Sequence, residues 1–305
     1  MAKKRQGTKT SSFGTSKREG HDSSLFYSRK LYSKQAVTNV SYVENRISKR
    51  IIDKVHCKDS RDMSMLPDTS IHLMVTSPPY NVGKDYDEDM SLNEYRELLR
   101  QVFSETYKKL VPGGRACVNV ANIGRSPYIP LHSYIIQDML EIGYKMRGEI
   151  IWDKAAGAGV STAWGSFRSA SNPTLRDTHE YILVFSKDVF KRESKGRENS
   201  VSKDDFLDWT KSIWRFSPES ARRVNHPAPF PIELPYRLIQ LYTFKNDVVF
   251  DPFCGSGTTC IAAIKADRHF VGYDIDKEYI KIAKDRILSF REKLEAERTQ
   301  LPLLV

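Results

Sequence analysis

Cysteine is scarce in this chain of 305 residues, and long apolar runs are absent. The four cysteines form no C-x-x-C pair, and no histidine lies at zinc-finger spacing from them, so we expect reduced cysteines, mostly buried, and no metal site. No apolar run approaches the roughly 20 residues that span a bilayer. No apolar segment follows the basic N-terminus either, so the sequence predicts no secretory signal and a cytoplasmic protein.

Basic residues outnumber acidic ones, 48 to 38, which gives a formal net charge of +10. This balance favours a polyanionic partner, because neutralised phosphates release their counterions. Residues 1–30 are rich in Lys, Arg, Ser, Thr and Gly and have almost nothing to bury, so we expect a disordered basic tail. Two interpretations stay open for this tail: an arm that contacts phosphates, or a solvated extension without a role.

From residue 50 onward, short apolar runs alternate with amphipathic segments. This alternation predicts an α/β fold with a doubly wound, mostly parallel sheet. Pro112-Gly113-Gly114 is expected to end the first helix, and Gly143 the second. Seven strands are predicted to begin at Ile51, Ile71, Ala116, Lys145, His179, Val248 and His269. Helices are predicted over residues 91–110, 129–142, 234–243, 257–266 and 278–298.

A glycine-rich loop follows the strand at residues 248–251 and leads directly into a helix. It reads Asp251-Pro252-Phe253-Cys254-Gly255-Ser256-Gly257-Thr258. This order places a ligand at the carboxyl end of the sheet. Cys260 occupies the place of the third glycine of a dinucleotide fingerprint, and no lysine follows Gly257 as it would in a P-loop. Asp251 disfavours a phosphate and favours a ligand that carries an amino group.

A second strand ends in an acid, Asp274, about twenty residues further on, where a carboxylate suits hydrogen bonds to ribose hydroxyls. A ligand with a ribose, an amino group and no phosphate fits S-adenosylmethionine. An ordinary tight turn between strand and helix would explain one glycine-rich loop alone. Two acids at the tips of two strands favour the cofactor.

Another candidate site, Thr76-Ser77-Pro78-Pro79-Tyr80, also follows an apolar strand. Two prolines remove two backbone donors and leave rigid carbonyls. These carbonyls and the Ser77 hydroxyl can accept hydrogen bonds from an amino group, and Tyr80 offers a face on which a base can stack. Such acceptors favour methylation of an exocyclic amine, which needs no nucleophilic cysteine but requires the base to leave the helix stack.

Together these motifs resemble the DNA amino-methyltransferases, which combine an S/D/N-P-P-Y/F catalytic motif with an F-x-G-x-G cofactor loop. The catalytic motif comes first here, which resembles the beta class of restriction-modification enzymes, over about residues 50–292. The resemblance implies a seven-stranded Rossmann-like sheet, with the strand at His179 antiparallel. It implies catalytic roles for Ser77, Pro78, Pro79 and Tyr80. It implies cofactor binding by Asp59, Asp251, Pro252, Phe253, Cys254, Gly255, Ser256, Gly257, Thr258 and Asp274.

The resemblance also divides the chain. It implies a catalytic half over residues 31–153 and a cofactor-binding half over residues 226–305, whose first residues close the methionine end of the cofactor. A target-recognition region would occupy residues 154–225, with one core strand near 179–186. This region is polar, and seven arginines and three tryptophans in it suit phosphate contact and base reading, namely Arg168, Arg176, Arg192, Arg197, Arg215, Arg222, Arg223, Trp164, Trp209 and Trp214.

The resemblance associates Ser77 with N4 of cytosine, by direct attack of a flipped base, and an Asp in its place with N6 of adenine. Both target atoms stay open, as do an RNA or protein-amide substrate and a catalytically silent DNA-binding protein. Methylation of C5 of cytosine would need a Pro-Cys pair, and none occurs. The expected partner is double-stranded DNA. A cognate restriction endonuclease is compatible with the resemblance, and we expect a monomer or a weak homodimer.

Overall fold

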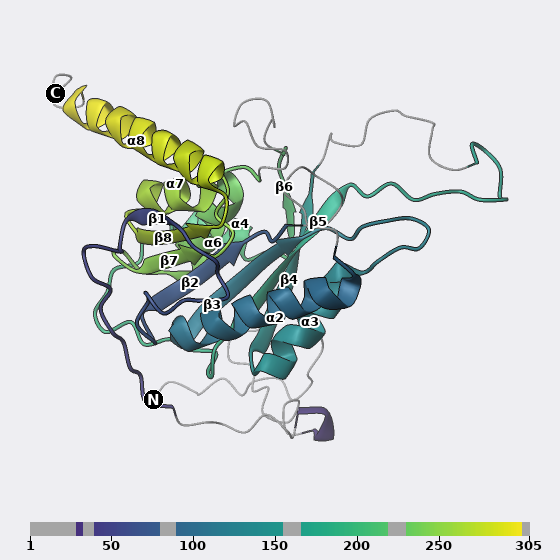
Figure 1. Cartoon of the computed structure of the whole chain (residues 1–305), viewed down its shortest axis with the longest axis horizontal. Helices are drawn as coiled ribbons and strands as arrows, with labels where there is room; N and C mark the ends of the chain where they lie inside the picture. The colour runs from purple at the N-terminus through teal and green to yellow at the C-terminus, as the bar shows by residue number, and fades with distance from the viewer. Residues whose placement is uncertain (1–28, 33–39, 80–89, 155–165, 219–229, 301–305) are drawn as a thin grey trace, which may run out of the picture. The chain divides into compact units, whose positions relative to one another are not determined.

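The computed structural model describes residues 29–32, 40–79, 90–154, 166–218 and 230–300 (Figure 1). The chain divides into two units, residues 1–39 and 40–305. In the first unit the structure describes one short 3-10 helix, η1, at Lys30–Tyr32. The predicted basic tail lies almost entirely outside the described residues.

Eight strands of the second unit form one sheet in the order β1-β8-β7-β2-β3-β5-β4-β6. β5 runs antiparallel to both of its neighbours, and every other pairing is parallel. The predicted α/β fold with a mostly parallel sheet is therefore confirmed, and so is the single antiparallel strand. The strands are β1 (Lys54–Cys57), β2 (Ile71–Thr76), β3 (Leu110–Val120), β4 (Lys145–Asp153), β5 (His179–Ser186), β6 (Ile213–Arg215), β7 (Val248–Asp251) and β8 (His269–Asp274).

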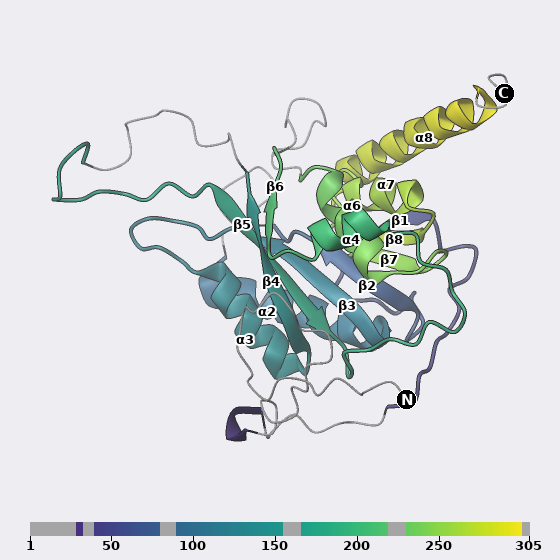
Figure 2. The same cartoon turned by 180° about the vertical axis from the view of Figure 1, so that it is seen from behind.

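Helices cover both faces of this sheet (Figures 1 and 2). β2 is buried along its whole length, as expected for a parallel strand with helices on both sides, and its side chains alternate between two apolar cores. Met74 packs in the core beneath α2 and α3, and Val75 packs in the core with α6, α7 and α8. The helices are α2 (Leu92–Lys109), α3 (Leu131–Ile142), α4 (Lys203–Trp209), α6 (Glu233–Tyr242), α7 (Thr258–Lys265) and α8 (Lys277–Gln300).

Two predicted boundaries were wrong. β3 begins at Leu110 and not at residue 116, because α2 already ends at Lys109 and the chain enters the sheet directly. Gly113 adopts a φ of 77° inside this strand, so the Pro-Gly-Gly sequence makes an irregularity in β3 and does not separate the helix from the strand. β1 begins at Lys54 and not at residue 51, since Asp53 has a left-handed φ of 61° that breaks the extended backbone.

Two elements were missing from the sequence prediction, β6 and α4. β6 has three residues and exists because it pairs with the end of β4, with Trp214 opposite Trp152. α4 precedes it and buries Trp209 at its last position. Trp209 and Trp214 lie in the same core as Trp152, and the guanidinium of Arg237 lies within 5.5 Å of the ring centroids of Trp209 and Trp214. Through Trp209 and Trp214, residues 202–216 therefore pack against the core of the fold, and β6 joins its sheet.

The cysteines of the second unit are free. Cys117, Cys254 and Cys260 are buried and Cys57 is exposed, which confirms that most of them lie in the interior. Within the described ranges, no group of three metal-ligating side chains is placed to hold an ion. None of the helices that the structure describes combines the length and the apolar character needed to cross a bilayer.

Candidate active site

The predicted motifs meet at one edge of the sheet, where the parallel strands end. Along this edge, β1 is followed by Asp59, β8 ends at Asp274, β7 ends at Asp251 and β2 leads into Ser77. These four strands are consecutive neighbours in the sheet, so segments more than 170 residues apart in sequence lie side by side. The carboxyl edge of a doubly wound sheet is the usual place for a ligand.

The turn after β2 is held against the glycine-rich loop by Thr76. Its hydroxyl donates a hydrogen bond of 2.7 Å to Oδ1 of Asp251, and both side chains are almost completely buried. Ser77 and Pro79, next along the chain, are half-buried and Pro78 is buried. The fourth predicted catalytic residue, Tyr80, lies outside the described residues. The Thr76–Asp251 hydrogen bond thus joins the two predicted motifs directly.

Asp251 is the most deeply buried acid of the site, with 1% of its surface exposed. Burial raises the pKa of its carboxyl group to about 6, although the Thr76 hydroxyl and the backbone N–H of Phe253 act in the opposite direction. The protonated form of the Asp251 carboxyl group is therefore more favoured in the folded protein than in the unfolded chain. A cationic group of a ligand near this carboxyl would favour its ionised form.

This burial predicts a pH-dependent effect of Asp251→Asn. A raised carboxyl pKa contributes stability that is present below the ordinary value near 4 and is lost as the pH rises through about 6. Without cofactor, we expect Asp251→Asn to gain up to about 3 kcal/mol of unfolding free energy relative to the wild type between pH 4 and pH 8. Urea unfolding across this range measures the difference, and a difference that stays constant with pH would contradict the expectation.

The glycine-rich loop is fixed from its backbone. The N–H of Gly255 donates to Oδ2 of Asp274 at 2.8 Å, and the N–H of Cys254 donates to the carbonyl of Tyr273 at 2.9 Å. The second oxygen of Asp274 accepts from the N–H of Asp276 at 2.9 Å. Burial raises the pKa of the Asp274 carboxyl, against the effect of these backbone donors. Asp274 therefore orients the glycine-rich loop through both of its carboxylate oxygens.

Two residues that support the loop were missed by the sequence analysis. Ser60 is buried and donates to the carbonyl of Pro252 at 2.5 Å. Arg286, on α8, donates to the carbonyl of Ser256 at 2.5 Å and to its hydroxyl at 2.6 Å. Arg286 is half-buried and stands between the buried Ala283 and Ile287 on α8. An arginine among apolar residues at helical spacing is the sequence signal that could have identified it.

Gly257 is a position of the loop where a side chain would be costly. It caps the N-terminus of α7 with a φ of 79°, and an added Cβ would lie 3.0 Å from Cβ of Ala283. We expect Gly257→Ala to lower the unfolding free energy by about 2 kcal/mol, from the left-handed backbone and from crowding. Gly196 has a similar φ of 78°, but an added Cβ there would meet open space. Gly148 has neither the left-handed φ nor the crowding. Thermal unfolding should rank the three losses in that order, and equal losses would contradict the crowding.

These observations describe a rigid loop between a strand and a helix, beside a Ser-Pro-Pro turn, at the carboxyl edge of the sheet. The family model described as DNA methylase, of the N6/N4 methyltransferases, matches residues 71–285, which include both motifs. The chain belongs to this family of DNA methylases.

Several relatives and solved structures are similar to this methylase. The type II methyltransferase M.MthZI of Methanothermobacter thermautotrophicus is 32% identical over 270 residues, 77% of this chain and 76% of the relative. M.MjaI of Methanocaldococcus jannaschii is 31% identical over 278 residues, 77% of this chain and 90% of the relative. The crystal structure of a putative DNA modification methylase from Thermus thermophilus, complexed with S-adenosyl-L-methionine, has a TM-score of 0.64 at 29% identity and covers 78% of this chain and 93% of its own.

Asp59 follows the edge strand β1 at the carboxyl edge of the sheet, and its carboxylate is already engaged. Arg61 forms an ion pair with it at 2.5 Å, and the backbone N–H of Arg61 donates to it at 2.9 Å. The Arg61 side chain therefore lowers the pKa of Asp59. Both side chains are about half exposed, so the pair contributes little to stability and leaves Asp59 accessible to a ligand.

A polar cluster on the strands next to the Ser-Pro-Pro turn was also missed by the sequence analysis. Asn119, near the end of β3, donates to the carboxylate of Glu180 at 2.6 Å, and Lys154 forms an ion pair with the same carboxylate. Because Thr76 pairs with Val118 in the sheet register, Asn119 follows on the strand beside Ser77. These three side chains come from β3, β5 and the residue after β4, so only the folded sheet brings them together.

The structure separates the arginines that the sequence analysis grouped for DNA contact. Arg192 and Arg197 form ion pairs with Asp247, which precedes β7, and Arg197 also pairs with Glu44. These contacts lie at the amino end of β7, opposite the carboxyl edge of the sheet, so both arginines support the fold. Arg215 pairs with Asp153 at 2.8 Å, at the carboxyl end of β4. Arg222, Arg223 and Trp164 lie outside the described residues.

Proposed function

We propose that this methylase transfers a methyl group from S-adenosylmethionine to the exocyclic N4 of cytosine in double-stranded DNA. The observation that carries the proposal is the hydrogen bond between Thr76 and Asp251, which joins the Ser77-Pro78-Pro79 turn to the glycine-rich loop. A reaction between a base and a cofactor needs both ligands in one fixed arrangement. This contact supplies a rigid connection between the places proposed for them.

S-adenosylmethionine is the cofactor, and the residues of the loop fit its chemistry. The Asp274 carboxylate has acceptor capacity beyond the two backbone donors it binds, which suits the ribose hydroxyls. Asp59 is accessible at the end of β1, beside β8, where it would contact the adenine. When bound, the cofactor supplies an electrophilic methyl group on a sulfonium. The loop residues Pro252, Phe253, Cys254, Ser256 and Thr258 would line the same ligand.

Catalysis would depend on acceptors placed around the target amine. The Ser77 hydroxyl and the Pro78 carbonyl would accept its hydrogens, which withdraws the nitrogen lone pair from conjugation with the ring. Pro79 removes a competing backbone donor and keeps this turn stiff. The base would leave the duplex and stack on Tyr80. No covalent enzyme intermediate is required, in agreement with the burial of Cys254 and Cys260, whose thiol pKa values burial raises well above the usual range.

The choice of cytosine N4 over adenine N6 rests on Ser77 in the first position of the catalytic motif. A serine hydroxyl accepts one hydrogen bond from an amine as an aspartate does, but it adds no negative charge beside the base. Adenine N6 is the alternative target, since either a serine or an aspartate at this position can accept a hydrogen bond from an exocyclic amine. A catalytically silent DNA-binding protein is the alternative of another class.

Residues 154–225 are proposed to contain the target-recognition region, within narrower limits than the sequence suggested. α4 packs against the core through Trp209 and β6 joins the sheet, so base reading would fall to the segments on either side of β5 and to the residues beyond β6. Phe167 and Leu175 are 67% and 83% exposed on one of these segments, before β5. A cognate endonuclease acting on the same sequence would complete a restriction-modification pair.

The test is to identify the labelled nucleoside. Purified protein is incubated with methyl-labelled S-adenosylmethionine and unmethylated DNA of mixed sequence, and the DNA is then digested and analysed by mass. N4-methylcytosine supports the proposal, and N6-methyladenine would retain the enzyme class but overturn the choice of base. Cofactor binding without any label in DNA would favour the silent DNA-binding protein or a different substrate.

A further inference from the structure

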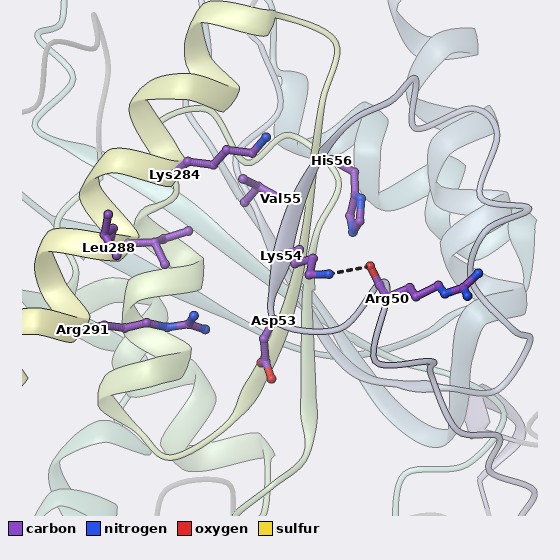
Figure 3. Close-up of a pocket in the computed structure, with 9 residues that line it drawn as sticks. Arg50, Asp53, Lys54, Val55, His56, Lys284, Leu288 and Arg291 are labelled. Carbon is purple, nitrogen blue, oxygen red and sulfur yellow. Dashed lines mark hydrogen bonds between the residues drawn. The ribbon is translucent and has the colours of Figure 1, made fainter. Parts of the chain in front are cut away.

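Two features outside the predicted motifs differ in where they lie on the sheet. A cleft of about 440 Å³ between β1 and α8 is lined by the start of β1, with Lys54, and by residues of α8 such as Lys284 (Figure 3). This cleft lies away from the carboxyl edge. The polar cluster of Asn119, Glu180 and Lys154 lies at the carboxyl edge, on β3 beside β2 and on the two strands beyond it. Of the two features, this cluster is the one placed to act on the Ser-Pro-Pro turn.

The buried amide of Asn119 lacks one hydrogen bond. Asn119 is 2% exposed, and its Nδ2 donates to the Glu180 carboxylate at 2.6 Å, whereas its Oδ1 has no donor within the part of the chain that the structure describes. Buried polar atoms of native proteins are nearly always hydrogen-bonded, so each exception requires an explanation, and a role in catalysis is one of those known. The unpaired oxygen therefore marks Asn119 as a candidate for a function beyond packing.

The order of three strands determines which way this oxygen faces. β3 lies between β2 and β5 in the sheet, and Glu180 belongs to β5. A carboxylate only accepts hydrogen bonds, so the nitrogen of the Asn119 amide is the atom that faces β5. The oxygen is on the other branch of the planar amide and is turned back toward the β2 side. Lys154 forms an ion pair with the same carboxylate and so helps to fix this orientation.

Ser77 is the residue that stands on the β2 side of Asn119. Val75 pairs with Cys117 in the register of β2 and β3, and both side chains lie in the same apolar core. Side chains alternate along a strand, so the residues two positions further on, Ser77 and Asn119, project from the same face of the sheet. Neighbouring strands are about 4.8 Å apart, a spacing that a serine and an asparagine side chain can bridge with a hydrogen bond.

A serine hydroxyl can accept a hydrogen from the target amine only when its own hydrogen points elsewhere. We propose that Asn119 is a positioning residue of the methyl transfer. Its Oδ1 accepts the hydrogen of the Ser77 hydroxyl when the base is bound, and this turns a lone pair of the hydroxyl toward the exocyclic amine. Catalytic hydrogen bonds often form fully only in the complex with the substrate. The inference rests on the proposed function, because it takes Ser77 as an acceptor for that amine.

The test is a double-mutant cycle between Asn119→Leu and Ser77→Ala, read as the single-turnover rate at saturating DNA and S-adenosylmethionine. Leucine has nearly the shape of asparagine and no polar side-chain atom. We expect Asn119→Leu alone to lower the rate on the order of tenfold, the effect of one hydrogen bond, and to have almost no effect in the Ser77→Ala background. A merely structural role would give the same factor in both backgrounds. Equal factors, or no loss in either background, would overturn the proposal.

A charge-conserving exchange tests the orientation of the amide. Asn119→Asp/Glu180→Gln reverses the polarity of the 2.6 Å hydrogen bond and still leaves an oxygen that faces Ser77. This double variant should recover most of the rate that Asn119→Leu loses, and no recovery would contradict the role of Oδ1. Cofactor affinity should be unchanged in each variant and shows that the variant folds. If leucine is not accommodated, Asn119→Ala takes its place in the cycle.

Two control variants accompany the cycle. Asn122→Leu removes another buried asparagine from the same edge, one whose oxygen accepts from the backbone N–H of His132, and its cost should be the same with and without the Ser77 hydroxyl. Lys284→Gln, in the cleft between β1 and α8, should leave the rate unchanged in both backgrounds. Coupling of Asn122 to Ser77 as strong as that of Asn119 would show a general effect of the edge and count against the proposal.

The proposed function and this inference fail in different ways. The rate is followed on whichever nucleoside takes up the label, so N6-methyladenine as the product would overturn the choice of base and leave the cycle intact. A labelled wild-type product with equal factors in the cycle would overturn the role of Asn119 alone. No labelled nucleoside in the wild type would overturn the proposed function and, with it, the role of Asn119.

Discussion

Ser77→Ala is expected to lower kcat on the order of a hundredfold while leaving the affinity for S-adenosylmethionine nearly unchanged. Removing one preorganised hydrogen-bond partner of a reacting group typically costs this much, because the partner acts mainly in the transition state. Ser77 is half-buried at the end of β2, while the loop proposed for the cofactor is fixed by other side chains, Ser60, Asp274 and Arg286. The two measurements are the single-turnover rate at saturating DNA and the cofactor affinity by calorimetry.

Thr76→Val is the matched variant for this experiment. It removes a hydroxyl from the preceding residue with little change of volume, and leaves Oδ1 of the buried Asp251 without the 2.7 Å hydrogen bond it accepts. We expect Thr76→Val to lower thermal stability and to weaken cofactor binding together with kcat, since the contact joins the two halves of the site. A loss of cofactor binding in Ser77→Ala, similar to that in Thr76→Val, would show that Ser77 supports the fold and does not hold the base.

Most of the fold could be predicted because its core strands are short apolar runs, and such runs are typical of strands that are buried on both faces. β5 and β8 begin and end where the sequence placed them, and Gly143 ends α3 in the left-handed conformation that glycine favours. β6 could not be found in this way. Its three residues carry one buried tryptophan between two exposed side chains, and only pairing with β4 makes them a strand. Ser202, which caps α4 three residues before Asp205, was a local signal that the sequence analysis overlooked.

The site was predictable at the level of motifs and not at the level of contacts. Strand ends followed by acids and by Ser-Pro-Pro indicated one edge of a sheet, and Asp251, Asp274 and Ser77 do lie on neighbouring strands there. The contacts that fix this edge join residues far apart in sequence, such as Ser60 to Pro252 over 192 positions. Local patterns do not encode such pairs. For the same reason, the sequence could not reveal that Arg192 and Arg197 pair with Asp247 at the other edge.

Asp274→Ala should weaken S-adenosylmethionine binding by on the order of a hundredfold, with a smaller effect on the rate at saturating cofactor. Hydrogen bonds to a charged group contribute about 1.5–3 kcal/mol each, and each 1.4 kcal/mol is tenfold in affinity. The substitution also removes the acceptor for the N–H groups of Gly255 and Asp276, so the loop itself should loosen. Calorimetric titration measures the affinity, and thermal unfolding without cofactor measures the loosening.

A cofactor analogue separates these two effects of Asp274→Ala. If Asp274 binds the ribose, an S-adenosylmethionine analogue without both ribose hydroxyls should bind the wild type weakly and should lose little more on Asp274→Ala, as in a double-mutant cycle. If Asp274 serves only to hold the N–H groups of Gly255 and Asp276, the full cofactor and the analogue should lose affinity by the same factor. Equal losses would therefore contradict the ribose contact. They would not bear on the position of the loop at the carboxyl edge, because Ser60 and Arg286 still hold its other backbone groups.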